Sequence, residues 1–249
     1  MGLQDSLIVG GAGLLAGFIN TLAGGGSLIT LPLLIFLGLP PNVANGTNRL
    51  AILLGTFSAA TGFRSKGVFV FPYSLWLGLS AVMGAVIGAK VSIDLKGETF
   101  NRILAVVMIL VVLNIVFNPL KKITAKTENL STGKQWAGIV AFFFVGIYGG
   151  FIQAGVGFII IATLTTINGF DLVKTNSIKA MVIFIYTIAA FSVFVLDQKV
   201  NWWVGFTLAA GNVSGAWIAS RWSVGRGQHF IKPILLVMVT AMAIRLWFF

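Results

Sequence analysis

Long apolar runs dominate this sequence and constrain its fold more than any single motif does. They lie at about 7–37, 44–63, 73–93, 103–118, 136–168, 175–196, 202–220 and 230–248. An α-helix needs about 20 apolar residues to cross a hydrocarbon core about 30 Å thick. Only 9% of the 249 residues are charged and 57% are hydrophobic, whereas soluble domains carry about 25% charged residues. The sequence therefore predicts an all-α polytopic membrane protein.

The excess of basic residues fits membrane loops better than nucleic-acid binding. The net charge is +11, yet no basic run is longer than the pair Lys121 and Lys122. Cytoplasmic loops of membrane proteins carry extra Lys and Arg, so we expect no nucleic-acid partner. The chain has no cysteine, which excludes disulfides, thiolate catalysis and metal–thiolate sites. The N-terminus lacks a basic region before its apolar stretch, so no removable signal peptide is expected.

The acidic residues avoid the centres of the apolar runs. All six lie in expected loops or at helix ends, and the single histidine, His229, lies at a segment boundary. They are Asp5, Asp94, Glu98, Glu128, Asp171 and Asp197. A buried proton relay or sodium ligand would need such a group, and hydrolytic chemistry would need a triad, a carboxylate pair or HExxH. We therefore expect no enzyme, no metal and no cofactor. Transport down a gradient, or coupling through backbone carbonyls, is favoured.

The chain divides near its midpoint at the polar stretch NPLKKITAKTENLSTGKQ, residues 118–135. We expect a first transmembrane repeat at 1–118, a cytoplasmic linker at 119–135 and a second repeat at 136–249. Similar blocks recur about 130 residues apart, as in many secondary transporters built by internal duplication. The blocks are 17–20 with 150–153, 46–51 with 176–181, and 84–92 with 215–223.

The first and fifth apolar segments are too long and too rich in glycine to be simple spanning helices. The segment 7–37 contains GGG at residues 24–26, and each glycine costs about 1 kcal/mol inside a helix. GVG at residues 155–157 interrupts the fifth segment in the same way. Two models fit: a broken helix that crosses once, or a re-entrant helix–loop–helix that returns to its starting side.

The distribution of basic residues favours the re-entrant model. In that model six of the 17 Lys and Arg residues lie opposite the linker, and the other 11 share its side. The six are Arg49, Lys90, Lys96, Arg102, Lys199 and Arg245. Because basic residues are enriched in the cytoplasm, the linker is expected there. Each half then has three full spans after its re-entrant helix, and this odd number makes the repeats inverted.

The two breaks are the first candidate for a functional site. Non-helical backbone is tolerated at membrane depth only where it is buried in protein or lines a water-filled cavity. Short helices beginning at Ser27 and Gly157 would direct N–H groups and positive dipole ends at such a cavity, which suits an anion. The alternative is that these glycines only allow close helix packing.

A polar cluster follows each break. In PPNVANGTNRL (40–50), Asn45, Asn48 and Arg49 can share one helical face, and a guanidinium suits a paired sulfonate, carboxylate or phosphate oxygen. The alternative is an arginine that reaches lipid headgroups. The second half has KTNSIKA at residues 174–180. The candidate substrate-binding residues are Asn20, Gly24, Gly25, Gly26, Ser27, Asn45, Thr47, Asn48, Arg49, Gln153, Gly155, Gly157, Asn176, Ser177 and Lys179.

Two stretches together resemble the sulfite exporter TauE/SafE family of integral membrane proteins. They are GFINTLAGGGSLITLPLLIFLGLPPNVANGTNRL and its weaker echo GFIQAGVGFIIIATLTTINGFDLVKTNSIKA. The resemblance implies a multi-pass transporter of the bacterial cytoplasmic (inner) membrane that exports sulfite or related organosulfonates. Alternating access around the two breaks would move the anion. A passive anion channel and a non-transporting scaffold or assembly protein remain alternatives. Exposed faces of small residues favour a homodimer.

Overall fold

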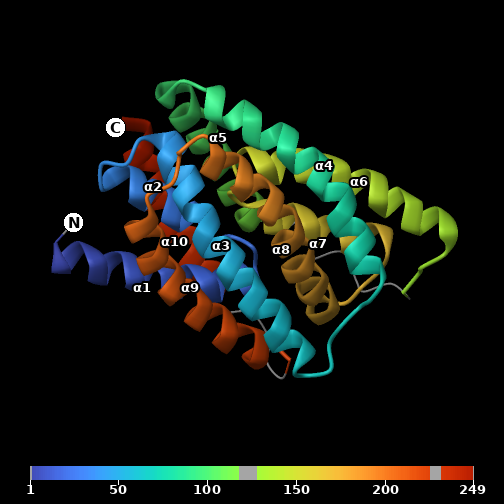
Figure 1. Cartoon of the computed structure of the whole chain (residues 1–249). Helices are drawn as coiled ribbons and strands as arrows, with labels where there is room; N and C mark the ends of the chain where they lie inside the picture. The colour runs from blue at the N-terminus through green and yellow to red at the C-terminus, as the bar shows by residue number, and fades with distance from the viewer. Residues whose placement is uncertain (1, 118–127, 225–230, 249) are drawn as a thin grey trace.

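The computed structural model describes residues 2–117, 128–224 and 231–248, and this part of the chain contains helices and no strands (Figure 1). Each half has two helices separated by a short break, followed by three more. The first half holds α1 (Leu3–Leu22), α2 (Ser27–Phe36), α3 (Pro41–Arg64), α4 (Tyr73–Asp94) and α5 (Gly97–Phe117). The second holds α6 (Thr132–Phe151), α7 (Val156–Ile167), α8 (Leu172–Leu196), α9 (Trp202–Trp222) and α10 (Ile231–Phe248).

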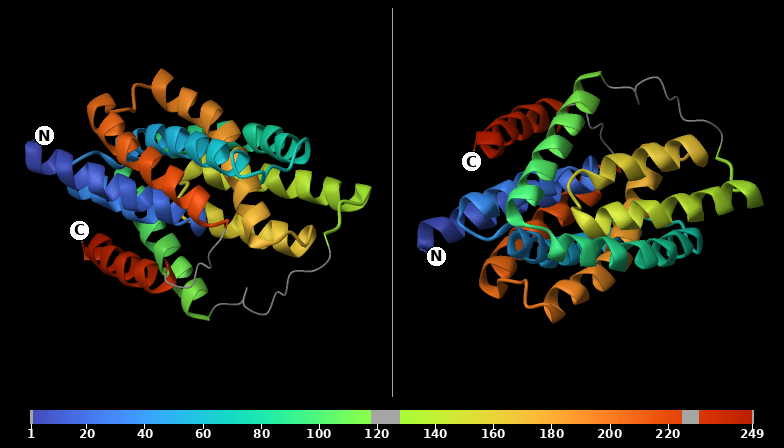
Figure 2. Two further views of the ribbon diagram at one scale, coloured as in Figure 1. Left: turned by 90° about the horizontal axis from the view of Figure 1, so that it is seen from below. Right: turned by 90° about the horizontal axis from the view of Figure 1, so that it is seen from above.

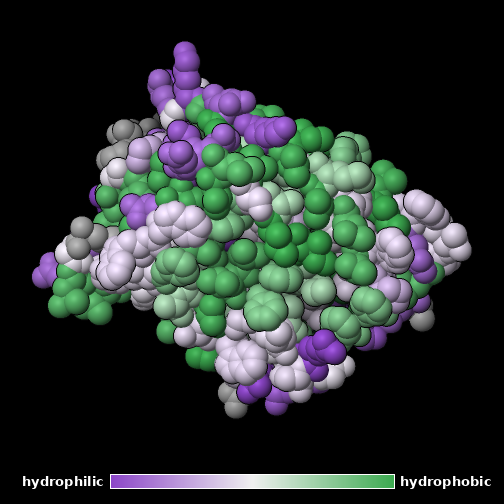
Figure 3. Space-filling model, in the orientation of Figure 1, coloured by the Kyte–Doolittle hydropathy of each residue, from purple (hydrophilic) through white to green (hydrophobic). Residues whose placement is uncertain are grey.

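The all-α prediction is confirmed for the described residues, and their surface fits a membrane. Among the described helices, α1, α4, α5 and α8 are long and apolar enough to cross a bilayer. Apolar side chains cover the middle of the face in Figure 3, and hydrophilic ones gather at its upper edge and lower right. This distribution is typical of a protein whose middle lies in lipid and whose ends meet water.

Some helices extend beyond the apolar runs that predicted them. α6 begins at Thr132, inside the stretch expected to be linker, and residues 119–127 of that stretch lie outside the described residues. Backbone bonding does not require apolar side chains, so the polar first turn of α6 continues the helix, and the Gln135 side chain donates to Leu130 O at 2.7 Å. α5 begins at Gly97 rather than near 103, and an exposed Glu98–Arg102 ion pair of 2.5 Å lies in its first turns.

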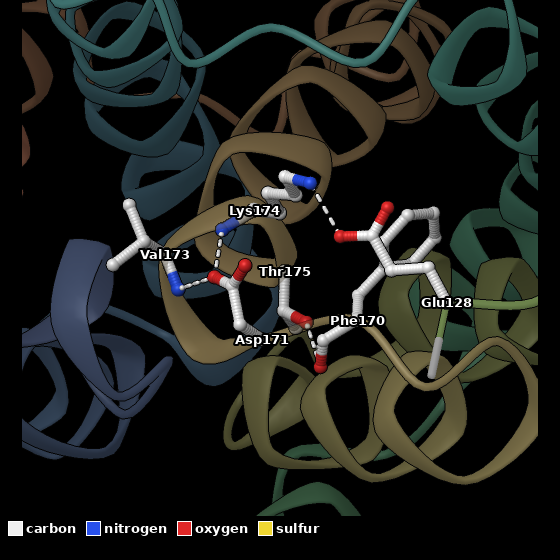
Figure 4. A network of polar contacts seen from close by, with 6 residues as sticks. All are labelled: Glu128, Phe170, Asp171, Val173, Lys174 and Thr175. Atoms are coloured by element: carbon white, nitrogen blue, oxygen red, sulfur yellow. Dashed lines mark hydrogen bonds and ion pairs between the residues drawn. The ribbon is translucent and has the colours of Figure 1, made fainter. Parts of the chain in front are cut away.

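The unit α6–α7 folds back on itself. Asn129, just before α6, donates its N–H to the carbonyl of Asn168, just after α7, at 2.9 Å. In Figure 4, Glu128 pairs with Lys174 in the first turn of α8, and Asp171 caps the same turn. Both ends of α6–α7 therefore lie at one end of the molecule. Figure 2 shows that α1–α2 is a second hairpin, which enters from the opposite end, where the N-terminus lies.

The first helix of each half packs against a long helix of the other half. α1 packs along α9, and α6 packs along α4, while α3 and α8 cross between these pairs. A methyl group on Gly17 would overlap the backbone of Asn212 in α9, and one on Gly150 would overlap the backbone of Ala85 in α4. Small residues therefore allow each broken unit to pack against a long helix of the opposite half.

Candidate functional site

The two helix breaks meet each other. A methyl group on Gly24 would overlap the backbone of Gly157, and a methyl group on Gly157 would overlap the backbone of Gly24. Gly24 lies between α1 and α2, and Gly157 lies in the first turn of α7. The structure thus brings together residues 133 positions apart in the chain, at a backbone–backbone contact for which only glycine has room.

The second break differs in detail from the sequence expectation. Asn20 was expected to match Gln153, but Asn20 lies in the last turn of α1 while Gln153 lies in the break itself, with φ 63°. α7 begins at Val156, one residue before the expected Gly157. A left-handed residue other than glycine costs of the order of 1–3 kcal/mol. Two hydrogen bonds hold the Gln153 side chain in place. Its Oε1 accepts from Tyr186 Oη at 3.2 Å and from Arg49 Nη1 at 3.5 Å.

Several backbone N–H groups at the breaks have no acceptor. Within the described part of the chain, the N–H groups of Gly25, Gly26 and Gly155 make no hydrogen bond, although all three residues are buried. They precede the N-termini of α2 and α7, which carry the positive ends of those helix dipoles. Buried unpaired donors are costly, and an anion is the ligand that such helix ends accept most readily.

Arg49 is fully buried and bonds the end of α6. Its Nη1 donates to Gly149 O at 3.1 Å, and its Nη2 donates to Gly150 O and, at 3.4 Å, to Phe151 O. These are the last carbonyls of α6, where the helix dipole is negative. The guanidinium also lies over the ring of Phe194, 4.7 Å from its centroid. Its Nε has no partner among the described residues.

Lys179 makes the corresponding contact with α1. Its side chain is 1% exposed, and Nζ donates to Thr21 O at 3.1 Å and to Asn176 Oδ1 at 2.7 Å. Asn176 Nδ2 donates to Leu22 O at 3.1 Å. The two cations that sequence analysis placed in corresponding positions therefore both bond the C-terminal carbonyls of a broken helix.

Other predicted residues divide into those near the breaks and those that bond loops. Asn48 Oδ1 accepts from Thr30 in α2 at 2.7 Å, while its buried Nδ2 has no partner in the described part of the chain. By contrast, Thr47 accepts from the Asn201 N–H at 2.9 Å, and Ser177 donates to Val68 O at 2.8 Å. The hydroxyls of Thr47 and Ser177 bond the loops before α9 and α4, so the structure does not direct them at the breaks.

Two tyrosines at the second break were missed. Tyr148 donates to Ala154 O at 2.5 Å, and Tyr186 donates to Gln153. The chain has only three tyrosines, and both of these lie inside apolar runs, where a hydroxyl needs a partner. Their place inside apolar runs was the sequence signal that could have identified them as site residues.

No carboxylate balances the two buried cations. All six Asp and Glu residues lie in the part that the structure describes, and none of them is buried. The ion pairs found there, Glu98–Arg102 and Glu128–Lys174, lie at the surface. Because a buried charge without a counter-charge is costly, the centre of the molecule is electrostatically suited to an anion.

Comparisons with known proteins identify the family of this chain. A family model described as sulfite exporter TauE/SafE matches residues 9–246. The chain belongs to this family. Its relatives include "Probable membrane transporter protein ORF9" of Sinorhizobium sp, 31% identical over 242 residues, which are 94% of this chain and 89% of that protein. "Probable membrane transporter protein YfcA" of Escherichia coli (strain K12) is 30% identical over 94% of this chain and 86% of its own length.

A "Probable membrane transporter protein" of Haemophilus influenzae is 29% identical over 91% of this chain and 88% of its own length. No solved structure matches the chain. The TauE/SafE description and the names of these relatives point to a membrane transporter rather than an enzyme.

Proposed function

We propose that this protein exports small sulfur-containing anions, such as sulfite or organosulfonates, across the bacterial inner membrane. The observation that carries the proposal is the meeting of the two breaks. There, within the described part of the chain, the N–H groups of Gly25, Gly26 and Gly155 have no acceptor, and the surrounding interior holds the cations Arg49 and Lys179 and no carboxylate. Sulfite or a sulfonate offers several acceptor oxygens and negative charge, which match N–H donors at helix N-termini. The TauE/SafE family description supports this substrate class.

The transport pathway follows from an inverted arrangement of the halves. In this proposal α1–α2 and α6–α7 are re-entrant hairpins that enter from opposite faces, and the remaining helices span the bilayer. Arg49 and Lys179 are buried, so they are not loop charges. Without Lys179, 10 basic residues lie on the linker side, and without Arg49, five lie on the opposite side. Of those 10, Lys121, Lys122, Lys126 and Arg226 lie outside the described residues. This excess supports a cytoplasmic linker.

Exposed tryptophans support the same placement. Trp76 and Trp136 lie one turn into α4 and α6, at the linker end, with 54% and 63% of their surfaces exposed. Trp202 and Trp203 begin α9 at the opposite end, with 48% and 69% exposed. Tryptophan concentrates at both membrane–water interfaces, and these positions would mark the two.

Alternating access accounts for the closed centre better than a permanent channel does. Gly24 and Gly157 are buried and in backbone contact, so an anion at the breaks would have no open path past this point. Movement of one half against the other would expose the breaks to each side in turn.

Flux in proteoliposomes tests the proposal. Purified protein should move sulfite or a small sulfonate with saturation, and substrate on the far side should accelerate exchange. Empty liposomes and an uncharged sulfone of similar size are the controls. Flux without saturation or trans-stimulation would favour the channel, and no flux across a broad panel of anions would favour a scaffold.

The orientation has its own test, which the natural lack of cysteine makes clean. Ser131→Cys and Leu172→Cys flank the α6–α7 hairpin at exposed positions, and Thr99→Cys lies at the start of α5. A membrane-impermeant maleimide should label the first two only from the cytoplasmic side and Thr99→Cys only from outside. Labelling of Ser131→Cys and Leu172→Cys from opposite sides would mean that α6–α7 crosses the membrane.

A further inference from the structure

We propose that the two halves cap each other's broken helix, and that Arg49 and Lys179 are the positioning residues that do so. Arg49 lies on α3 of the first half and bonds the end of α6 in the second, while Lys179 lies on α8 of the second half and bonds the end of α1 in the first. Each break would therefore be held in place by the opposite half. This inference concerns the site of the proposed function, but it rests on these contacts and on no particular substrate.

Each cap has a second member, which makes the two caps alike. Asn45, four residues before Arg49, donates to Phe151 O, the last carbonyl of α6, at 2.8 Å. Asn176, three residues before Lys179, donates to Leu22 O, the last carbonyl of α1, at 3.1 Å. Residues three and four apart share a helical face. An asparagine and a cation on one face thus bond the final carbonyls of a helix that would otherwise end without partners.

The caps also have an electrostatic consequence. In transporters with discontinuous helices, half-helix C-termini coordinate coupling cations, and half-helix N-termini face anionic substrate groups. Here the guanidinium of Arg49 and the ammonium of Lys179 occupy the carbonyls at the negative ends of α6 and α1. Resident cations therefore take the place of a bound metal ion at these ends, while the N–H groups of Gly25, Gly26 and Gly155, which precede α2 and α7, have no acceptor in the described part of the chain.

The caps differ in strength. Arg49 reaches three carbonyls and Gln153 through a planar fork, whereas Lys179 reaches one carbonyl and Asn176. A guanidinium loses less freedom per hydrogen bond than an ammonium. The end of α1 should consequently be the more easily released of the two.

Cysteine probes at the first residue after each break test this arrangement. Ser27→Cys lies at the first residue of α2, and Val156→Cys lies at the first residue of α7. The native residues are 4% and 1% exposed. Each probe is combined with Lys179→Met or with Arg49→Met, which remove the charge and keep most of the volume. The rate of reaction with a small maleimide is measured in proteoliposomes without any substrate, next to the thermal transition of each variant.

We expect a crossed pattern. Lys179→Met should raise labelling of Ser27→Cys at least about tenfold, which corresponds to about 1.4 kcal/mol, and leave Val156→Cys within about twofold. Arg49→Met should do the reverse. Lys179→Arg and Arg49→Lys should restore most of the protection, because they keep a cation at the helix end. If Arg49→Met does not accumulate as folded protein, Asn45→Ala replaces it and Asn176→Ala replaces Lys179→Met, each as a separate variant. These two variants should give the same crossed pattern with smaller changes.

Any other pattern overturns the proposal. An equal rise in labelling rate at both probes would show general loosening of the protein. A rise only at the probe in the half that carries the variant would show that each cation holds the break of its own half. Unchanged labelling rates would show that the contacts do not hold the breaks. Because no anion is present, failure of the flux experiment would leave this result standing, and the two failures can be told apart.

Discussion

Gly157→Ala is expected to reduce anion flux at least about tenfold and to lower the thermal stability of the purified protein. The added methyl group would overlap the backbone of Gly24, and backbone at a helix break cannot rotate aside as a flexible side chain can. Overpacking of a close-packed interior costs about 1–3 kcal/mol, and more where the surroundings cannot yield. Sulfite flux in proteoliposomes and the thermal transition in detergent measure the two effects.

Gly11→Ala is the matched control, because it adds a methyl group to a helical glycine that has no atom within 4 Å of the new carbon. It should change neither flux nor stability appreciably. If Gly157→Ala transports and melts like the parent protein, the two breaks are not in contact in the working transporter.

The first helix break could be predicted from the sequence. GGG inside an apolar run is a local signal, since helix propensity and span length depend on neighbouring residues. For this reason the interruption near Gly24 and the start of α2 at Ser27 followed from sequence. The charged residue after each break was also visible, because Arg49 and Lys179 interrupt apolar helices.

What the sequence did not show was where those charges go. The carbonyls that Arg49 bonds lie about 100 residues away in the chain, and only packing of the halves brings them within reach. The polar groups of Thr47 and Ser177 gave the same signal as Asn45 and Asn176, yet they bond loops. Residue type alone does not distinguish a hydroxyl that fixes a loop from an amide that caps a buried helix end.

Arg49→Ala is expected to have the largest effect of any single side-chain truncation in this protein. It removes a fully buried cation and leaves the carbonyls of Gly149 and Gly150 without a donor, while Phe151 O keeps Asn45 and Gln153 Oε1 keeps Tyr186. Each buried acceptor that loses its only donor costs about 1–3 kcal/mol. The site also loses one of the two positive charges that would attract an anion. Flux should fall to background and the thermal transition should drop.

Arg49→Lys separates the two contributions to this loss. It restores the positive charge but not the planar fork, so it should recover stability in part and flux to a smaller extent. Arg102→Ala is the control, since Arg102 is exposed and its ion pair with Glu98 lies at the surface, where such pairs contribute about 0–1 kcal/mol. Undiminished flux in Arg49→Ala would remove Arg49 from the transport site. Intact folding with flux abolished would instead place its main role at the anion.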